Sequence, residues 1–464
     1  MTSTTSISTS TDLQRLSQEL EGQLVLPTND AYDSTRAVVL ATADLRPAAI
    51  ARVANDDDVA RVVRFARDSG MELAVRSGGH SGAGHGSTDG GIVIDLRAMK
   101  ALEIDEDSTA AWAEAGLTAG EVTQALAGRN LAIGFGDTGS VGIGGITLGG
   151  GVGYLVRKHG LTIDNLLAAD LVTADGEQLR VDAESHPDLF WAIRGGGGNF
   201  GVATRFRYRL HPLEKILGGM LVLPATAATV AGFMRLSDEA PEELSTIANV
   251  MTCTPMPFVP EEHHGSIVIL GMVCWAGDPD EGERVVGQFR ALAEPLADMV
   301  ALTSYTSLYP PEDPDYRPTA VAKTMFLDHV DEGLGADIVQ RLQAADAAFV
   351  AVQLRALGGA SARVPVEATA YAHRKSRVMA NVAAFYEGEA DRPAKQAWVD
   401  DTATALHQGD DGAYVNFVAD EGPERVRAAY PGATWDRLVE IKRRYDPNNL
   451  FHRNQNIGLA ALRP

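Results

Sequence analysis

The sequence of 464 residues contains only two cysteines, Cys253 and Cys274, and neither belongs to a CxxC pair or a histidine-rich cluster. A disulfide framework cannot be built from them, and neither can a structural zinc site. We therefore expect a chain without a bound metal that works in a reducing, cytoplasmic setting.

Positive charge is also scarce, because 40 lysines and arginines stand against 62 aspartates and glutamates, which gives a net charge of -22. Such a chain repels a phosphate backbone and releases none of its counterions. Nucleic acids and anionic membrane surfaces are therefore not expected as partners.

Long apolar segments are missing as well, since no run approaches the roughly 18 residues that cross a bilayer. The Ser/Thr-rich start lacks the basic and apolar regions of a secretory signal. We interpret residues 1–14 as a disordered tail of a soluble protein.

Hydrophobic residues make up 45% of the chain, which is enough for the cores of two or three compact units. Apolar spacing predicts a helix over 56–70 and buried strands at 72–76 and 92–96. Thr118 and Glu121 have capping-box spacing, and the Asp-Gly pair within 171–179 predicts a hairpin. These elements predict an α+β domain over residues 15–212.

The glycine clusters thin out after residue 212, and the pattern of the chain changes. Longer strand candidates at 266–275 and 349–357 alternate with helical stretches such as 281–292. We assign residues 213–412 to a second α+β domain.

Two glycine-rich runs carry the chemistry of the first domain. Arg76–Gly86 places five glycines, two serines and two histidines in one turn, and Gly142–Tyr154 interleaves glycines with apolar side chains. Successive backbone N–H groups at glycines can point into one concavity, which suits a pyrophosphate. A flexible linker is the alternative for the second run, but linkers do not carry side chains such as Ile146 and Leu148 between their glycines.

A third run, Gly196–Gly201, matches the G-x-G-x-x-G pattern of dinucleotide-binding folds. That fingerprint must open a helix, whereas residues 202–210 alternate in polarity as a half-buried strand does. We therefore reject NAD binding here and expect the run to bring backbone close to a ligand held by the other two loops.

Six motifs together resemble the berberine-bridge-enzyme-like group of FAD-linked oxidases, in the vanillyl-alcohol-oxidase superfamily. The motifs, in chain order, are Arg76–His80, Gly142–Gly153, Arg157–Leu161 with Asp164–Asn165, Pro187–Trp191, Arg194–Val202 and Tyr445–Phe451. The resemblance implies a two-part PCMH-type FAD-binding domain, a substrate domain with an antiparallel sheet, and a segment 413–464 that completes the FAD domain and its site.

The same resemblance implies how FAD is attached. His80 stands where such enzymes bond a histidine to the flavin 8α-methyl group, with His85 as a rival in the same loop. Thr138 occupies the position of a second, cysteinyl link, and a hydroxyl cannot replace a thiolate there, so a single covalent bond is expected. Val141 falls at a position described as an oxygen gate, where a small side chain favours an oxidase; plain core packing is its alternative.

The residues expected to contact FAD come from these motifs. They are Arg76, Ser77, Gly78, Gly79, His80, Ser81, Gly84, Thr138, Gly139, Ser140, Val141, Gly144, Gly145, Gly149, Gly150, Gly151, Gly153, Tyr154, Asp164, Asn165, Gly201, Val202, Tyr414 and Asn416. Asp164 and Asn165 have an alternative role, which is to cap the turn before Leu166.

Three residues are candidates for catalysis. Tyr414 belongs to a Tyr-x-Asn motif, and a tyrosine accepts a proton only if charge or hydrogen bonds lower its pKa. We expect Asn416 to share its face of a strand. Gln353 and Arg355 alternate on strand 349–357, where Arg355 could stabilise a tyrosinate or bind an acidic substrate group, unless both face solvent. Tyr371, His373 and Arg374 form a further polar cluster of open role.

The resemblance favours an FAD-dependent oxidase that moves hydride from a substrate C–H group to the flavin, with O2 as the final acceptor and H2O2 as the product. The expected substrate is a small organic alcohol, sugar or secondary-metabolite hydroxyl. An amine oxidase of the 6-hydroxynicotine-oxidase type, a flavin dehydrogenase with another acceptor and a flavin-binding protein without turnover are the alternatives.

Overall fold

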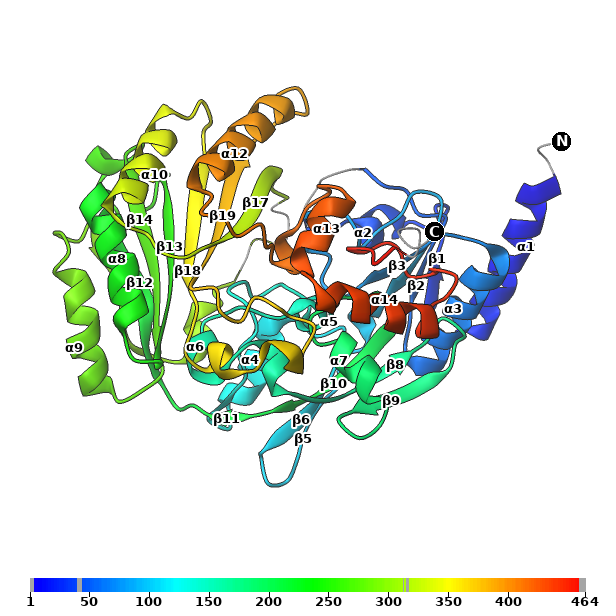
Figure 1. Cartoon of the computed structure of the whole chain (residues 1–464). Helices are drawn as coiled ribbons and strands as arrows, with labels where there is room; N and C mark the ends of the chain where they lie inside the picture. The colour runs from blue at the N-terminus through cyan, green and yellow to red at the C-terminus, as the bar shows by residue number, and fades with distance from the viewer. Residues whose placement is uncertain (1–3, 40–43, 312, 314–316, 459–464) are drawn as a thin grey trace.

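The computed structural model describes residues 4–39, 44–311, 313 and 317–458. The chain folds into two lobes (Figure 1). The first domain is formed by the N-terminal part of the chain together with residues 413–458, and the second domain is formed around one large sheet. The fold is therefore α+β in both parts, as predicted.

A four-stranded sheet forms one part of the first domain, with the order β1-β2-β4-β3. Its strands are β1 (Gln23–Val25), β2 (Ala49–Arg52), β3 (Leu73–Arg76) and β4 (Ile92–Asp95). Helix α3 (Asp56–Ser69) packs on it through four fully buried side chains, Val59, Val62, Val63 and Ala66. The Asn55 side chain caps the start of this helix, and Gly70 ends it with φ 67°. The predicted helix and both predicted strands are confirmed.

A five-stranded antiparallel sheet forms the other part of the first domain, with the order β5-β6-β10-β8-β9. Its strands are β5 (Leu102–Ile104), β6 (Ala110–Glu114), β8 (Leu166–Val172), β9 (Gln178–Asp182) and β10 (Val202–Arg209). Thr118 and Glu121 form the predicted capping box at the start of α4 (Ala119–Ala127). Because β10 directly follows the third glycine run, that run opens a strand and no helix, as predicted.

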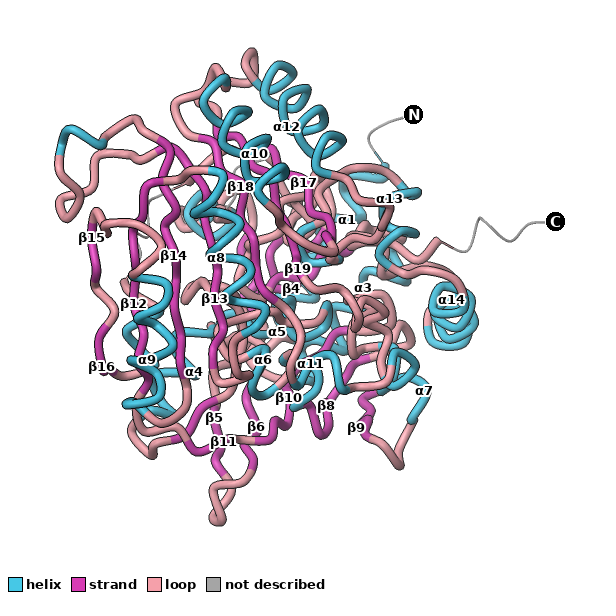
Figure 2. The backbone as a smooth tube through the Cα atoms, turned by 60° about the vertical axis from the view of Figure 1, so that its left-hand side comes forward, coloured by secondary structure: helices cyan, strands magenta, loops and turns pink. Residues whose placement is uncertain are grey.

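The second domain contains an eight-stranded antiparallel sheet with the order β15-β12-β14-β13-β18-β19-β17, in which β16 also pairs with β12. Its strands are β12 (Ile216–Pro224), β13 (Leu244–Thr252), β14 (Ile267–Trp275), β15 (Ala297–Asp298), β16 (Ala301–Thr303), β17 (Ala320–Leu327), β18 (Val350–Ala356) and β19 (Val378–Phe385). Helices α8 (Ala227–Glu239), α9 (Pro279–Arg290), α10 (Glu332–Ala344) and α12 (Arg392–Leu406) cover one face (Figures 1 and 2). The opposite face is directed toward the first domain.

The C-terminal segment returns to the first domain through α13 (Pro423–Ala429) and α14 (Ala433–Tyr445), and α14 packs beside α7 (Pro187–Ala192). The Lys442 ammonium is completely buried and donates to Asp446 Oδ2 at 2.6 Å, to the Asn199 carbonyl at 2.8 Å and to the Phe451 carbonyl at 2.9 Å. The closing Tyr445–Phe451 motif therefore attaches the end of the chain to the third glycine run.

Two expectations about chain organisation need correction. Residues 1–14 were expected to be disordered, but α1 (Thr4–Glu19) is a helix that buries Leu13 and Leu16 in the core of the first domain, while residues 1–3 lie outside the described part. The sequence 358–377, assigned to the second domain, bonds to the first: the Trp191 indole N–H donates to the Glu367 carbonyl at 2.8 Å, and the Ala370 amide donates to the Arg194 carbonyl at 3.0 Å.

The remaining elements are short. They are α2 (Tyr32–Arg36), α5 (Ile143–Gly149), α6 (Val156–His159), α11 (Ala360–Arg363), β7 (Leu131–Ala132), β11 (His211–Pro212) and the 3-10 turns η1 (Leu96–Ala98), η2 (Thr162–Asn165), η3 (Glu261–His263), η4 (Tyr305–Leu308), η5 (Val366–Ala368) and η6 (Val415–Phe417). Helix α5 lies inside the second glycine run, which was expected to be a loop throughout.

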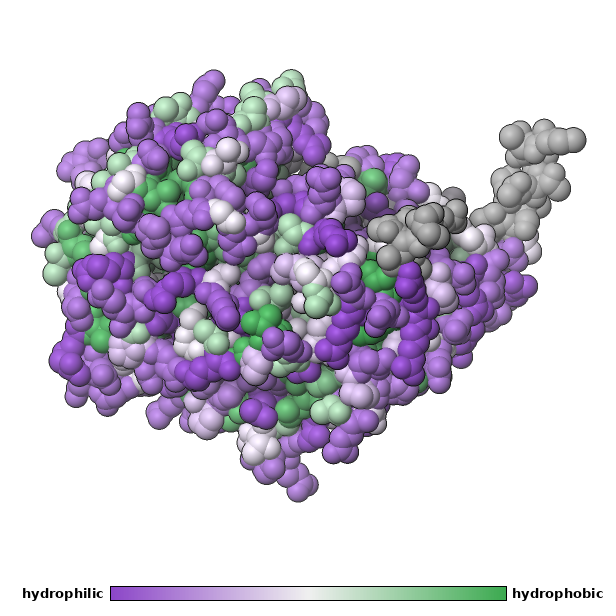
Figure 3. All heavy atoms as spheres, viewed as in Figure 1, coloured by the Kyte–Doolittle hydropathy of each residue, from purple (hydrophilic) through white to green (hydrophobic). Residues whose placement is uncertain are grey.

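The face seen in Figure 3 is mainly hydrophilic, with small scattered apolar groups. Across the described residues, no helix is both long and apolar enough to cross a membrane. The same residues hold no group of three or more His, Cys, Asp or Glu side chains arranged for a metal ion.

Candidate active site

A cleft of about 1590 Å³ runs between the two domains. The first and second glycine runs line it on one side, and β17, β18 and β19 line it on the other. Residues 414–421 of the C-terminal segment and the third glycine run complete its wall. Segments from the whole length of the chain therefore meet at this one cavity.

The first two glycine runs touch through their backbones. A Cβ atom on Gly78 would lie 2.2 Å from the Gly142 amide nitrogen, and one on Gly142 would lie 2.2 Å from the Gly78 amide nitrogen. The Ser77 hydroxyl joins the runs, because it donates to the Ala115 carbonyl at 2.5 Å and accepts from the Gly144 amide at 3.2 Å. Any side chain at either glycine would separate the loops, so this approach requires glycine in both.

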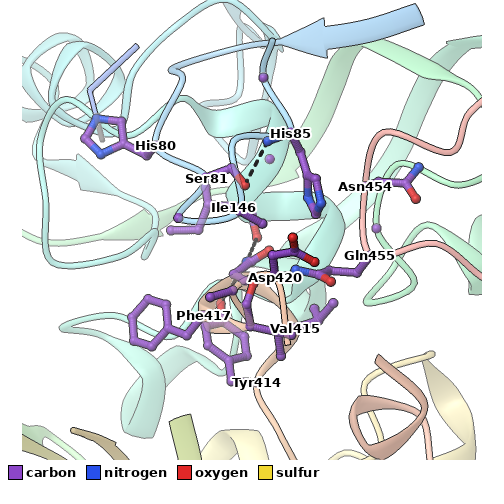
Figure 4. Close-up of a pocket in the computed structure, with 18 of the residues that line it drawn as sticks. His80, Ser81, His85, Ile146, Tyr414, Val415, Phe417, Asp420, Asn454 and Gln455 are labelled. Carbon is purple, nitrogen blue, oxygen red and sulfur yellow. Dashed lines mark hydrogen bonds between the residues drawn. The ribbon is translucent and has the colours of Figure 1, made fainter. Parts of the chain in front are cut away.

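His80 and His85 both border the cleft (Figure 4). The His80 Nε2 atom lies 2.9 Å from Ser140 Oγ, across the contact between the two loops. Burial, reinforced by the nearby Arg453, lowers the pKa of His85 to about 4, so His85 is neutral at physiological pH. Ser81 lines the cleft beside them, and its hydroxyl accepts from the His85 amide at 3.4 Å.

The loop that precedes α5 places Thr138 and Val141 on the cleft wall. Two tyrosines hold this loop from behind: the Tyr309 hydroxyl donates to the Gly136 carbonyl at 2.8 Å, and the Tyr154 hydroxyl to the Asp137 carbonyl at 3.4 Å. Tyr154 thus supports this loop, and its contact with the cofactor stays a prediction.

The predicted residues divide into two groups by their place in the fold. Those that line the cleft are Arg76, Ser77, Gly78, Gly79, His80, Ser81, Thr138, Val141, Gly144, Gly145, Gly201, Val202, Gln353, Arg355, Tyr414 and Asn416. Those that lie outside its lining are Gly84, Gly139, Ser140, Gly149, Gly150, Gly151, Gly153, Tyr154, Asp164 and Asn165.

Several residues of the second group, and Arg76, have a structural role. The fully buried Arg76 guanidinium pairs with Asp95 at 3.1 Å and donates to the Thr35 carbonyl at 2.8 Å. Asp164 accepts from Arg374 at 2.7 and 2.8 Å and from the Leu161 amide at 2.9 Å. Asn165 donates to the His159 carbonyl at 2.9 Å. Asp164 and Asn165 therefore hold the turn before Leu166, which is the second of the two roles considered for them.

Tyr414 is 2% exposed and is one of the residues that line the cleft. The phenol oxygen accepts from the Gly151 amide at 2.9 Å and from Asn416 Nδ2 at 3.0 Å. Burial raises the pKa of Tyr414, and these hydrogen bonds together with the positive charge of Arg355 oppose the rise without reversing it. The phenol is therefore protonated at neutral pH in the unliganded protein.

The expectation that Tyr414 and Asn416 share a face of a strand is wrong. Tyr414 precedes the 3-10 turn η6, which brings the Asn416 side chain back to the Tyr414 hydroxyl. Gly149 makes room for this turn, since a Cβ atom there would lie 1.9 Å from Asn416 Oδ1.

Gln353 and Arg355 lie on the cleft face of β18, as predicted, but the Arg355 guanidinium is already engaged. It donates to Asp137 Oδ2 at 2.5 Å, to Gln353 Oε1 at 2.8 Å and to the Val152 carbonyl at 3.1 Å. It also lies 5.1 Å from the centre of the Phe417 ring. Arg355 thus joins the second domain to the second glycine run and to the loop that precedes it, and its pairing with Asp137 argues against a role as an anion receptor.

Tyr371 and His373 pack behind the cleft. Tyr371 is buried with its ring centre 6.2 Å from that of Tyr414, and burial raises its pKa. His373 Nε2 lies 3.1 Å from the Ala429 carbonyl, and burial lowers its pKa. Both side chains are packing elements of this region.

Sequence reasoning missed several polar residues of the cleft. Asp137 is paired with Arg355, Lys323 on β17 with Asp400 on α12 at 2.8 Å, and Arg425 with Glu421 at 3.6 Å. Asn381 on β19 also borders the cleft. Strand alternation could have placed Asn381 on the polar face of β19, but nothing in the sequence brings Lys323 and Asp400 together.

The cleft fits the FAD that the resemblance implies. Glycine backbones form one wall of it, and a Cβ atom on Gly145 or Gly198 would meet no atom within 4 Å, so both backbones face open space along the cavity. Gly145 and Gly198 can therefore approach a dinucleotide closely. Bound there, FAD would supply a two-electron acceptor.

Comparison with known proteins agrees with this site. Residues 47–182 match the FAD binding domain family, and residues 413–458 match the berberine and berberine-like family. An FAD-linked oxidoreductase of Dictyostelium discoideum is 31% identical over 414 residues, which cover 87% of this chain and 87% of that protein.

Two further matches concern one bacterial activity. The (R)-6-hydroxynicotine oxidase of Paenarthrobacter nicotinovorans is 29% identical over 460 residues, which cover 94% of this chain and 97% of that protein. The crystal structure of 6-hydroxy-D-nicotine oxidase from Arthrobacter nicotinovorans superposes with a TM-score of 0.85 at 27% identity, covering 95% of this chain and 98% of that one.

Proposed function

Because the chain belongs to the berberine-bridge-enzyme-like family of FAD-linked oxidoreductases, we propose that it is an oxidase that converts a substrate hydroxyl to a carbonyl and passes the electrons to O2. The observation that carries the proposal is Tyr414, a residue of the cleft lining whose hydroxyl is held by the Gly151 amide and Asn416. The tyrosinate form of Tyr414 can take the proton of a substrate hydroxyl when the neighbouring C–H bond is oxidised.

Different residues of the chain bind the cofactor and promote proton transfer in this proposal. The glycine loops bind and orient FAD, the Gly151 amide and Asn416 stabilise the tyrosinate form of Tyr414, and Arg355 adds a positive charge beside it. Only the ionised phenol can accept a proton, so burial of Tyr414 makes turnover depend on alkaline pH or on changes that accompany substrate binding.

The covalent link is the second part of the proposal, and we assign it to His80. Its ring borders the cleft at the contact between the two glycine loops, where Ser140 holds it. Acid precipitation should leave the flavin in the protein pellet, and His80→Ala should release it into the supernatant. His85→Ala is the matched control from the same loop and should retain the flavin; release by His85→Ala alone would move the link to that residue.

The use of O2 is the third part. Val141 lines the cleft, and a branched but small side chain leaves more room for O2 than a longer one. Val141→Leu should slow reoxidation of the reduced enzyme by air several-fold while leaving anaerobic flavin reduction near wild type. Equal reoxidation rates would remove Val141 from this role, and a wild-type enzyme that air reoxidises slowly would be a dehydrogenase.

The deciding experiment is anaerobic mixing of the purified holoprotein with D-glucose, benzyl alcohol or (R)-6-hydroxynicotine, followed by air and an H2O2 assay. Bleaching by an alcohol and H2O2 formation support the proposal. The relatives that oxidise 6-hydroxynicotine favour a second candidate, an amine oxidase. Bleaching by the amine alone, undiminished in Tyr414→Phe, would establish that candidate, and a flavin that no probe bleaches would indicate a binding protein.

A further inference from the structure

The cleft face of the second domain carries a row of polar side chains across four neighbouring strands. In the register of the sheet, Asn249 on β13 pairs with Gln353 on β18, Gln353 pairs with Asn381 on β19, and Asn381 pairs with Thr324 on β17. These four side chains project from the same face of the sheet, because paired residues of an antiparallel sheet share a face.

Three members of this row have hydrogen-bond partners. Gln353 Nε2 donates to Asn249 Oδ1 at 2.8 Å, and Asn249 Nδ2 donates to the Leu270 carbonyl at 3.2 Å. The Thr324 hydroxyl donates to the Ala380 carbonyl at 3.3 Å. Gln353 Oε1 is occupied by the Arg355 guanidinium. Both neighbours of Asn381 therefore already bond to other groups of the chain, and no hydrogen bond joins either of them to Asn381 Oδ1.

The Oδ1 atom of Asn381 is shielded from solvent and has no hydrogen-bond partner within the described part of the chain. The side chain nevertheless borders the cleft. A shielded carboxamide oxygen without a partner destabilises the fold, and the great majority of such groups in native proteins are paired. An amide kept in this state at the edge of a cavity indicates that its partner arrives with a ligand.

We propose that Asn381 is a specificity-determining residue whose carboxamide binds a hydroxyl group of the substrate. A hydroxyl donates and accepts, and a carboxamide offers both an acceptor and donors, so a turn about the terminal torsion of Asn381 allows either bond. The inference rests on the proposed function, which it deepens by naming the group that the second domain recognises.

The charges on this side of the cleft favour a neutral substrate. Three carboxylates of the lining are each paired with a cation: Asp137 with Arg355 at 2.5 Å, Asp400 with Lys323 at 2.8 Å, and Glu421 with Arg425 at 3.6 Å. A substrate with a net charge would compete with these pairs, whereas a neutral hydroxylated molecule would leave them intact. The class that fits Asn381 is therefore a hydroxylated organic molecule that leaves these three pairs intact.

The first test needs no substrate and compares two asparagines of the same row in the holoprotein. Asn381→Leu removes a carboxamide whose oxygen bonds to nothing in the described chain, so we expect an unchanged or higher Tm. Asn249→Leu leaves Gln353 Nε2 without its acceptor, and we expect Tm to fall by about 2–4 °C. A fall in Asn381→Leu equal to that in Asn249→Leu would make Asn381 a structural residue and overturn the proposal.

The second test measures steady-state kinetics of wild type and Asn381→Leu with D-glucose and benzyl alcohol. We expect KM to rise about 10-fold for the probe that wild type oxidises, with kcat changed less than about threefold, as for the loss of one binding hydrogen bond. An unchanged KM would overturn the proposed contact between Asn381 and the substrate and would leave the proposed oxidase function standing. If neither alcohol reduces the wild-type flavin, the proposed function fails, and the contact with a hydroxyl substrate fails with it.

Discussion

The two sides of the cleft are built in different ways. The first domain contributes backbone: Gly78 and Gly142 touch, and Gly145 and Gly198 face open space along the cavity. The second domain contributes side chains, such as Gln353 and Asn381, that neighbouring strands place in register. A backbone site tolerates almost no substitution at its glycines, whereas a side-chain site can change its chemistry without changing the sheet beneath it.

This difference separates the two tasks of the protein. A dinucleotide is the same for every member of the family, and a surface of peptide N–H groups binds it without side-chain specificity. The substrate differs from one member to the next, and replaceable side chains on a rigid sheet can follow that change. The comparison predicts that variants of the glycine backbone in the first domain lose the cofactor, whereas variants of the polar side chains on the sheet of the second domain lose selectivity.

The largest effect is expected from Gly78→Ala. The added methyl group would lie 2.2 Å from the Gly142 amide nitrogen, so the two glycine loops must separate. We expect the purified protein to carry no flavin absorbance. Gly287→Ala on α9 is the control, because its methyl group meets no atom within 4 Å, and this variant should remain yellow. A yellow Gly78→Ala protein with wild-type Tm would contradict the backbone site.

The next largest effect is expected from Tyr414→Phe, which removes the proton acceptor and should lower kcat about 100-fold. The control is Tyr371→Phe, a neighbouring buried phenol whose hydroxyl has no partner in the described residues, and its kcat should change only a few-fold. Because burial raises the pKa of Tyr414 above the ordinary value of tyrosine, wild-type kcat should still be rising at pH 10. A flat pH profile would argue against a tyrosinate base.

A stability effect without loss of cofactor is expected from Asp164→Asn. Arg374 is 2% exposed, and loss of its carboxylate partner leaves a buried, uncompensated charge, which costs about 3–5 kcal/mol. Urea unfolding should show this loss while the flavin content stays at wild type. Glu239→Gln breaks an exposed pair with Arg235 and should change stability by about 0.5 kcal/mol at most. If Asp164→Asn instead releases the flavin, Asp164 contacts the cofactor, as the sequence led us to expect.

The smallest effect concerns the junction of the two domains, where His159 and His211 stack with ring centres 3.8 Å apart. Burial lowers their pKa values to about 3 and about 4, so both are neutral in the folded protein and take up protons more readily when unfolded. Their contribution to stability is complete above pH 6.5 and declines as pH falls from 6.5 toward 4. His159→Phe should show a shallower decline in Tm over this range, and an equal decline would exclude the pair as its source.

Local signals in the sequence were sufficient for much of the first domain. Helix α3 follows from its apolar spacing, its Asn55 cap and Gly70, and α4 from the Thr118 and Glu121 capping box. The glycine runs were recognisable as a binding surface because glycine spacing is itself the structural requirement. Such features depend on residues a few positions apart, so the sequence displays them directly.

Other features could not be obtained in this way. Tyr414 and Asn416 were placed on a strand, but their contact comes from a 3-10 turn that fits against Gly149, more than 250 positions earlier. Asp137 forms an ion pair with Arg355, more than 200 positions later, and no local sequence pattern connects the two residues. The sequence of helix α1 predicted a disordered tail because most of its residues are polar, although the helix buries two leucines in the core.

The amino-acid order alone thus specified the class of fold, the cofactor surface and the residues at its centre, because glycine and capping patterns act over short distances. Folding in three dimensions decided which polar groups are occupied and which remain open. The Arg355 guanidinium already donates hydrogen bonds to Asp137 and to the Val152 carbonyl, whereas Asn381 Oδ1 has no hydrogen-bond partner in the described residues. Whether a polar group finds a hydrogen-bond partner depends on which distant segments of the chain lie next to it. Those neighbours are fixed by the register of the sheet and by the contact between the domains, which exist only in the folded chain.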